Sequence, residues 1–320
     1  MAGTQQEFER VVSLLREAQS VCIITHLRPD ADAVGSATAL GLGLRQLGKD
    51  VSMVIGQRRE VPANLLTIPG ARDIQTASSL PTDFDVYVTV DCGSLDRTGC
   101  FAEELAALDN LVCIDHHASN PGFGQTNLVR PECESTTVLL TKVLDMAAVQ
   151  IDRDIAHCLY AGLVTDTGSF RWGRPVMHDY AHRYMQYGID TKQIAVDLID
   201  STNADDIQMI GRVLAGLQIV PAGQYQVGIL VAALEDTAGH SESSVESLVD
   251  FVRALEGTDL GVVFKEQETG VWAVSLRSSQ IDCAELAGRL GGGGHVPAAG
   301  YTTQGSAEDI IAQLVAALRG

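Results

Sequence analysis

The chain has 320 residues, of which 46% are hydrophobic and 20% are charged, and its formal net charge is −19. At about 150 residues per domain, this length predicts two domains with ordinary globular cores. The acidic balance argues against a protein that wraps long nucleic acid, because such proteins present a broad basic face. It is compatible with a short anionic substrate whose charge is neutralised by metals and a few arginines.

The start of the chain carries charged residues such as Glu7 and Arg10 in an amphipathic pattern, which is not that of a signal peptide. No run of about 18 apolar residues is present to span a membrane. The seven cysteines form no CxxC pair, and several of them, including Cys22 and Cys92, lie in or beside apolar runs. Free cysteines of this kind behave as small buried hydrophobic residues. The sequence therefore predicts a cytoplasmic protein without a disulfide framework.

In the first half of the chain, short apolar runs rich in β-branched residues alternate with helical patterns. The predicted strands are residues 21–25, 51–55, 86–90 and 111–114, and residues 33–47 carry apolar side chains at helical spacing. Near-continuous apolar strands separated by helices are typical of a parallel sheet covered on both faces. We therefore predict a doubly wound α/β domain.

The second half begins with a helical pattern over residues 190–218, which ends at Pro221-Ala222-Gly223. A strand follows near Tyr225, another covers residues 271–276, and an amphipathic helix starts at about Ala307. We predict a catalytic domain at 1–190, a helical connector at 191–222 and a smaller α/β domain at 223–320.

The first cluster of polar residues is THLRPDADAVGS, which follows the first predicted strand and opens a helix. It places His26, Asp30 and Asp32 at the carboxyl edge of the sheet, where ligands bind in open α/β folds. Pro29 stiffens the turn, and Gly35 is interpreted as keeping bulk away from the site. A second interpretation of Asp32 is that it only caps the helix.

Further acidic and imidazole residues follow later apolar segments. Asp91 comes directly after residues 86–90, Asp115-His116-His117 ends the run that begins at residue 111, and Asp166 follows a helical segment. A single aspartate at a strand end is usually a turn or cap residue. Several of them at what should be one edge of the sheet predict a common site.

A mixed set of carboxylate and imidazole ligands without cysteine favours Mn²⁺ over a structural zinc site, with Mg²⁺ or Co²⁺ as alternatives. Two such ions about 3.5–4 Å apart can activate a water molecule and stabilise charge on a phosphoryl group. This arrangement requires a bridging carboxylate, for which Asp91 is the natural candidate. Carboxylates packed this closely would repel one another without cations.

The ordered motifs His26-x-x-Pro29-Asp30-x-Asp32, Asp91, Asp115-His116-His117 and Asp166 resemble those of the DHH phosphoesterase superfamily. The later segments Ser275-Leu276-Arg277-Ser278 and GGGGH at residues 291–295, with Ala298-Ala299-Gly300, resemble the DHHA1 domain. Within the superfamily, the likeness is to standalone bacterial oligoribonucleases (nanoRNases) that are also 3′-phosphoadenosine 5′-phosphate phosphatases. Some of that group hydrolyse cyclic di-AMP or its linear product.

The resemblance implies one metal held by His26, Asp30 and Asp91, and a second held by Asp32, Asp91, His116 and Asp166. It implies that His117 faces the scissile phosphate and that Asp115 orients a neighbouring group. Arg28 stands where many relatives carry asparagine, and Ala31 replaces a common glycine. Neither change removes a ligand.

Residues 291–294 are four successive glycines, whose backbone N–H groups could form a nest for a phosphate. Together with the resemblance, this predicts a substrate-binding set made of Arg277, Ser278, Gly293, Gly294 and His295. The alternative is that the glycine run is only a flexible turn. The substrate is expected in the cleft between the two domains, which favours short nucleotides over long polymers.

Trp172 and Phe170 follow Asp166 and could either stack on a base or belong to the core. His157, His178, His182 and His240 have no neighbouring ligand pattern and are interpreted as packing or surface residues.

The predicted function is a divalent-metal-dependent phosphohydrolase of short phosphorylated nucleotides: 3′-phosphoadenosine 5′-phosphate, oligoribonucleotides of two to four residues, pApA or cyclic di-AMP. One alternative is an inorganic pyrophosphatase or exopolyphosphatase of the same superfamily, against which the GGGGH run argues. A second alternative is a non-catalytic nucleotide sensor, although every expected ligand is present. The resemblance also implies a homodimer.

Overall fold

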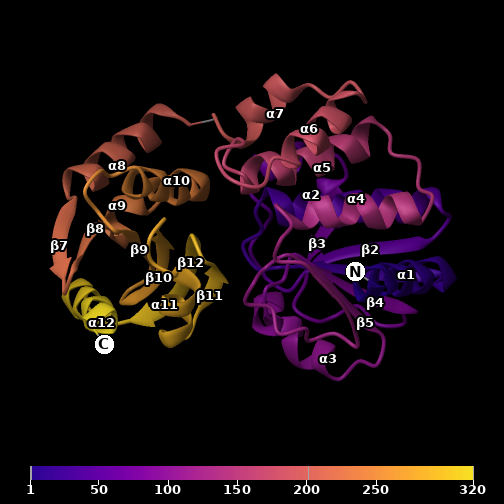
Figure 1. Ribbon diagram of the computed structural model, residues 1–320, viewed down its shortest axis with the longest axis horizontal. Coiled ribbons are helices and arrows are strands. Elements are labelled where there is room, and N and C mark those ends of the chain that lie inside the picture. The colour runs from indigo at the N-terminus through magenta and orange to yellow at the C-terminus, as the bar shows by residue number, and fades with distance from the viewer. Residues whose placement is uncertain (1, 201, 320) are drawn as a thin grey trace. The chain divides into compact units, whose positions relative to one another are not determined.

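The computed structural model of the chain describes residues 2–200 and 202–319 and contains two compact units, which divide between Ser201 and Thr202 (Figure 1). The division lies inside the segment 191–222 that the sequence predicts as a connector. Helix α7 (Thr191–Leu198) belongs to the first unit and helix α8 (Ala204–Ala215) to the second. Among the described residues, no helix is both long enough and apolar enough to cross a membrane.

The first unit is built on a six-stranded, fully parallel sheet in the order β3-β2-β1-β4-β5-β6. Its strands are β1 (Ser20–Thr25), β2 (Asp50–Ile55), β3 (Ile74–Thr76), β4 (Val86–Val90), β5 (Leu111–Asp115) and β6 (Thr126–Val129). The four predicted strands are therefore confirmed, and the two short edge strands are additions. The strand order reverses between β1 and β4, which is where open α/β sheets bind ligands.

Helices cover both faces of this sheet, as predicted for a doubly wound fold. Five of the six α-helices that precede α7 in the described part of the first unit lie on one face: α1 (Ala2–Glu17), α2 (Ala31–Gln46), α4 (Thr136–Met146), α5 (Arg153–Asp166) and α6 (Met177–Met185). They share one core with alternate side chains of the central strands, such as Val21 and Val88. On the opposite face, Cys22 and Tyr87 pack with Phe101 and Leu105. That cover comes from a 3₁₀ segment (Leu95–Phe101) and helix α3 (Ala102–Ala106), and two more 3₁₀ turns lie at Leu65–Thr67 and Ala71–Asp73.

Helices α2 and α5 approach closely because glycines face the neighbouring helix. A Cβ atom on Gly35 would lie 2.5 Å from the carbonyl oxygen of Cys158. The interpretation of Gly35 as a residue that clears space for a ligand is therefore wrong. Its absent side chain brings α5, which ends in Asp166, against α2, which begins beside Asp30.

The second unit has a mixed sheet in the order β11-β12-β10-β9-β8-β7, in which only β8 and β9 pair in parallel. Its strands are β7 (Gln218–Ala222), β8 (Tyr225–Ala232), β9 (Leu260–Glu268), β10 (Val271–Arg277), β11 (Gly293–His295) and β12 (Ala298–Gln304). Besides α8, its helices are α9 (Leu234–Thr237), α10 (Glu242–Arg253), α11 (Cys283–Arg289) and α12 (Ala307–Arg319). The α/β class predicted for both halves is confirmed.

A buried carboxylate ties α8 to the start of α10. Asp206 is 2% exposed and accepts hydrogen bonds from the hydroxyls of Ser241 (2.5 Å) and Ser244 (2.9 Å), and His240 Nδ1 lies 2.8 Å from its second oxygen. Burial acts to raise the pKa of Asp206, but these hydrogen bonds outweigh it and lower the pKa to about 2. His240 is thus a packing residue, as predicted.

Replacing Asp206 with asparagine is expected to lower the free energy of unfolding of the second unit by about 1–3 kcal/mol at neutral pH, because hydrogen bonds to a charged acceptor are lost. The folded-state pKa lies below the unfolded value of about 3.9. The stabilisation is therefore complete above pH ~4 and is lost as the pH falls toward about 2, where the two proteins should converge. Urea unfolding followed by Trp272 fluorescence in a Trp172→Phe background measures the difference. The neighbouring, exposed Asp205→Asn is the control and should show little change.

Candidate metal centre

The structure brings all the predicted metal ligands to one place, at the carboxyl ends of β1, β4 and β5. His26 follows β1, Asp91 follows β4, and His116 follows β5. Asp30 and Asp32 lie at the start of α2, and Asp166 is the last residue of α5. The parallel sheet explains this convergence, because the carboxyl ends of its central strands share one edge.

One group of possible ligands consists of His26, Asp30 and Asp91, whose ligand atoms lie within 4.8 Å of one another. His26 Nε2 is 3.7 Å from Asp30 Oδ2 and 3.6 Å from Asp91 Oδ2. These three residues come from the end of β1, the cap of α2 and the end of β4. They match the set that the resemblance implies for the first metal.

A second group consists of Asp32, Asp91 and His116. His116 Nε2 lies 3.9 Å from Asp32 Oδ2, 3.6 Å from Asp91 Oδ1 and 3.1 Å from Asp166 Oδ2. Asp91 therefore directs Oδ2 toward the first group and Oδ1 toward the second. A carboxylate with one oxygen facing each group has the geometry of a bridging ligand.

Asp30 combines a structural position with its place in the first group. It is the N-cap of α2, and its Oδ1 accepts hydrogen bonds from the backbone N–H groups of Asp32 (3.1 Å) and Ala33 (3.0 Å). Its Oδ2 is the atom that faces His26. The cap therefore belongs to Asp30 and not to Asp32, because Asp32 is the second residue of the helix and its oxygens accept from N–H groups at the start of α4.

The imidazole rings are oriented in the way that metal ligands require. His26 Nδ1 lies 2.8 Å from the carbonyl oxygen of Leu27, and His116 Nδ1 lies 3.3 Å from that of Cys133. A carbonyl at Nδ1 favours the tautomer with hydrogen on that atom, which leaves a lone pair on Nε2. At His26 the guanidinium of Arg97, which can only donate, opposes this preference from 3.1 Å. In both rings Nε2 is the atom that faces the carboxylates. This donor set fits two divalent cations.

The electrostatics of the cluster lead to the same conclusion. Burial and Arg97 lower the pKa of His26, but Asp30 and Asp91 outweigh them and raise it to about 10. Burial raises the pKa of Asp166 to about 6, against the opposing effect of His116. In the absence of a cation, a carboxylate of the cluster either stays ionised beside a protonated histidine or takes up a proton itself. Bound cations would replace those protons.

His117 differs from the other two histidines because a carboxylate holds its Nδ1. That atom lies 2.8 Å from Asp115 Oδ1, and Asp115 is fully buried. Asp115 Oδ2 in turn accepts a hydrogen bond of 2.7 Å from the side chain of Asn120. The ring of His117 is therefore fixed with Nε2 on the side away from Asp115.

Several residues that surround the site were not predicted. Asn120 orients Asp115, and the backbone N–H groups of Thr136 and Thr137 donate to Asp32 at 2.7 and 3.0 Å. Arg97 Nη2 lies 3.1 Å from His26 Nδ1. The run Ser135-Thr136-Thr137 is typical of a helix N-terminus and could have predicted the start of α4. No local pattern indicates that the first N–H groups of this helix bind Asp32.

Two backbone positions in the site adopt left-handed conformations. Asp91 has φ +59° and Arg28 has φ +50°. Aspartate and asparagine adopt this conformation more readily than other non-glycine residues, whereas arginine does so at a cost. An asparagine would suit the conformation of Arg28 better. Gln57 partly compensates, because its side chain accepts a hydrogen bond of 2.8 Å from the Arg28 N–H.

The predicted substrate-binding residues lie in the second unit, at the ends of β10 and β11, where Arg277 and His295 both pair with Ala298 of the intervening strand β12. Arg277 donates to the carbonyl oxygen of Leu276, and burial lowers its pKa. That bond uses one N–H group of the guanidinium. The hydroxyl of Ser278 is already used, because it donates to Asp259 O at 2.6 Å and accepts from the N–H groups of Gln280 and Ile281.

The second half of the glycine run is a β-strand and not a flexible turn. Gly293 and Gly294 belong to β11, which pairs with β12, and His295 is the last residue of that strand. A Cβ atom on Gly292 would lie 2.1 Å from Gly300 O, and one on Gly294 would lie 2.6 Å from the Cα atom of Ala299. Gly292 and Gly294 are thus required because the chain passes very close to β12 at these positions, whereas a Cβ atom on Gly291 would meet nothing within 4 Å.

The aromatic residues after Asp166 have separate functions. Phe170 packs against Tyr160 and His178, so it belongs to the core. Trp172 is 39% exposed, and its indole N–H donates to the carbonyl oxygen of Asp166 at 2.6 Å. The loop reaches this arrangement through three consecutive left-handed residues, Gly168 to Phe170. Trp172 therefore helps to hold the end of α5.

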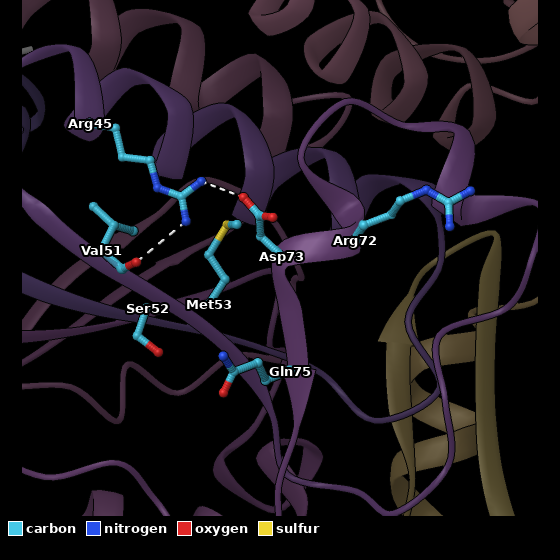
Figure 2. Close-up of a pocket in the computed structure, with 7 residues that line it drawn as sticks. All are labelled: Arg45, Val51, Ser52, Met53, Arg72, Asp73 and Gln75. Atoms are coloured by element: carbon cyan, nitrogen blue, oxygen red, sulfur yellow. Dashed lines mark hydrogen bonds and ion pairs between the residues drawn. The ribbon is translucent and has the colours of Figure 1, made fainter.

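A separate cavity of about 570 Å³ lies beside β2 and β3 (Figure 2). Its lining residues are Arg45, Val51, Ser52, Met53, Arg72, Asp73 and Gln75. The guanidinium of Arg45 is occupied, since it donates to Asp73 at 2.6 Å and to Val51 O at 3.4 Å. Because none of the predicted site residues lines this cavity, we do not assign it a function.

Gly162 on α5 allows Asp32 to occupy its position, so Gly162→Ala is expected to destabilise the first unit by about 1–3 kcal/mol. A Cβ atom there would lie 2.2 Å from Asp32 Oδ1 and 2.6 Å from the Thr137 side chain. Gly211→Ala on α8 is the matched control, because no atom lies within 4 Å of that Cβ. It should stabilise the second unit by about 0.5–1 kcal/mol. Trp172 and Trp272 fluorescence report the two units; a stabilised Gly162→Ala would contradict the packing argument.

Comparison with protein families agrees with this organisation. Residues 20–163 match the model described as "DHH family, N-terminal domain", and residues 226–320 match the DHHA1 domain. The "Bifunctional oligoribonuclease and PAP phosphatase NrnA" of Thermus thermophilus is 29% identical over 306 residues, which are 94% of this chain and 89% of the relative. The "Cyclic-di-AMP phosphodiesterase GdpP" of Geobacillus thermodenitrificans is 26% identical over 88% of this chain and 44% of its own length.

A crystal structure of an exopolyphosphatase-related protein from Bacteroides fragilis has the same fold. It superposes with a TM-score of 0.84 at 23% identity, covering 98% of this chain and 96% of that protein. The likeness extends over both units and supports the α/β organisation of each.

Proposed function

This chain belongs to the phosphoesterases that combine a DHH-family N-terminal domain with a DHHA1 domain, and from that premise we propose that it hydrolyses short phosphorylated nucleotides. The proposed substrates are 3′-phosphoadenosine 5′-phosphate, oligoribonucleotides of two to four residues, and pApA or cyclic di-AMP. The names of the Thermus and Geobacillus relatives cover these chemistries.

One observation supports the proposal above the others: Asp91 faces two ligand groups with its two oxygens. Oδ2 lies 3.6 Å from His26 Nε2, and Oδ1 lies 3.6 Å from His116 Nε2. Two cations held by these groups, Mn²⁺ in our proposal, would supply Lewis-acid stabilisation of a phosphoryl group and a water molecule of lowered pKa.

The residues of the chain then have distinct proposed roles. Asp32, Asp91, His116 and Asp166 hold one cation, and His26, Asp30 and Asp91 hold the other. His117, oriented by Asp115, contacts the scissile phosphate and assists proton transfer through Nε2. In the second unit, Arg277 and His295 bind a phosphate or base of the substrate. Because its hydroxyl is engaged in the turn, Ser278 contributes through the backbone that it shapes.

The main alternative is an inorganic pyrophosphatase or exopolyphosphatase built on the same first domain. The DHHA1 domain at residues 226–320 argues against it, because the resemblance links that domain to nucleotide substrates. A nucleotide sensor without activity is the second alternative. The complete set of ligand groups argues against that.

The test is turnover of 3′-phosphoadenosine 5′-phosphate, pApA, cyclic di-AMP and pyrophosphate in parallel, with Mn²⁺, Mg²⁺, Co²⁺ or excess chelator. We expect hydrolysis of one or more nucleotides that is highest with Mn²⁺ and abolished by the chelator. Consumption of pyrophosphate alone would move the protein to the alternative enzyme class. Tight nucleotide binding without turnover would identify a sensor. Sedimentation of the same preparation tests the proposed homodimer.

A further inference from the structure

Thr136 contacts two carboxylates that come from different parts of the sheet. It is the first residue of α4 and is fully buried. Its backbone N–H donates to Asp32 Oδ2 at 2.7 Å, and its hydroxyl donates to Asp91 Oδ1 at 2.9 Å. Asp32 belongs to α2, whereas Asp91 follows β4. One residue therefore sets the position of these two carboxylates relative to each other.

The start of α4 is itself held firmly. Ser135 is the N-cap, and its hydroxyl accepts a hydrogen bond from Val138 N at 3.2 Å and lies 2.6 Å from the Thr137 hydroxyl. The first N–H groups of a helix lack partners within the helix and carry partial positive charge. Asp32 occupies two of them, since Thr137 N also donates to its other oxygen. The two N–H groups therefore hold both oxygens of Asp32 at the start of α4.

The hydroxyl of Thr136 controls a torsion that would otherwise be soft. The terminal torsion of an aspartate is broad, so a carboxylate rotates easily unless its oxygens are held. Asp91 Oδ1 is the oxygen that faces His116, and the Thr136 hydroxyl bonds to that same atom. The bond leaves Oδ2 facing His26.

We infer that Thr136 is a positioning residue that aligns Asp32 and Asp91, and that its hydroxyl sets the affinity of the second metal group. The inference rests on the proposed function, because it requires that these carboxylates bind cations. Groups that orient metal ligands typically contribute about 10–100-fold to metal affinity. The first group shares Asp91 but also contains His26 and Asp30, to which none of the described hydrogen bonds of Thr136 leads, so its affinity should change less.

The decisive experiment is a Mn²⁺ titration at fixed pH, by calorimetry and by electron paramagnetic resonance, of four proteins. Thr136→Val removes the hydroxyl but keeps the volume and the N–H, and Thr136→Ser keeps the hydroxyl. Thr141→Val is the matched control. Thr141 lies in the same helix, is also buried, and its hydroxyl bonds to Thr137 O and Tyr184 instead of to a carboxylate.

We expect the wild type to bind two Mn²⁺ ions, and Thr136→Val to bind one of them about 10–100-fold more weakly, with the other nearly unchanged. Thr136→Ser should stay within about threefold of the wild type, and Thr141→Val should lose stability without a change in Mn²⁺ affinity. Unchanged binding by Thr136→Val, or equal weakening by Thr141→Val, would overturn the inference. Thr136→Ala serves if the valine variant does not fold.

The same data separate this inference from the proposed function. If the wild type binds no Mn²⁺ and hydrolyses no nucleotide, the proposed function fails and the inference fails with it. If the wild type binds two ions and hydrolyses a nucleotide but Thr136→Val behaves identically, only the inference fails.

Discussion

Asp91→Asn is expected to lower nucleotide turnover by about 10³-fold or more, with the fold retained. The amide keeps the shape of the side chain but removes the charge that faces both ligand groups. Loss of metal-based stabilisation of a phosphoryl group is worth several kcal/mol, and about 4 kcal/mol corresponds to three orders of magnitude in rate. Steady-state rates with saturating Mn²⁺, together with a Mn²⁺ titration, measure the effect.

The stability of the Asp91→Asn variant should fall when no metal is present. Asp91 is 2% exposed, and burial acts to raise its pKa, but His26, His117 and His116 outweigh burial and hold the pKa well below its usual range. The amide cannot make these ion pairs, whereas the left-handed backbone, with φ +59°, is tolerated by asparagine. We therefore expect a lower melting temperature in chelator and a smaller rise on addition of Mn²⁺.

The exposed Asp109→Asn is the control for Asp91→Asn, because it changes the net charge equally without touching the site. It should retain wild-type turnover and wild-type response to Mn²⁺. Turnover by Asp91→Asn within tenfold of the wild type would contradict a shared ligand and would separate the two groups of carboxylates functionally.

The location of the site could be predicted from the sequence because it depends on strand ends alone. Buried strands at 86–90 and 111–114 each run directly into a polar residue, Asp91 and Asp115, and parallel strands place such residues at one edge. The prediction needed neither the order of the strands nor the positions of the helices. It was therefore insensitive to the short edge strands β3 and β6, which carry too few residues to show a periodic pattern.

The residues that hold the ligands in place could not be predicted, because their contacts depend on how helices pack. Thr136 reaches Asp32 and Asp91 only because α4 starts beside α2. Gly35 was misinterpreted for the same reason. A glycine near a motif suggests space for a ligand, but the carbonyl oxygen of Cys158 in α5 occupies the space that a side chain on Gly35 would need.

In the second unit, the glycine run illustrates a limit of composition. Four glycines are compatible with a phosphate nest, a flexible turn or a close strand pairing, and all three use the absence of a Cβ atom. Only the register of Gly293 with Gly300 and of Gly294 with Ala299 distinguishes them. That register depends on β12, whose sequence gives no indication of its partner.

The second large effect is expected for His117→Asn, which should lower kcat by about 10²–10⁴-fold through the loss of proton transfer. Unlike Asp91→Asn, it should bind Mn²⁺ with near wild-type affinity. Asp115 holds His117 Nδ1 at 2.8 Å. The rings that direct Nε2 at the carboxylates of the metal groups are those of His116 and His26. Single-turnover rates at saturating Mn²⁺, measured beside a Mn²⁺ titration, separate the two properties.

Two further variants test whether the His117 ring acts through its orientation. Asp115→Asn weakens the contact that fixes the ring and should cost about 10–100-fold in rate, less than loss of the ring itself. His182→Asn, on the exposed face of α6, should leave the rate unchanged. A Mn²⁺ affinity that falls in parallel with the rate in His117→Asn would show that this histidine is a ligand. Equal rates for His117→Asn and the wild type would assign proton transfer to another group, and Asp115 would then be buried for stability alone.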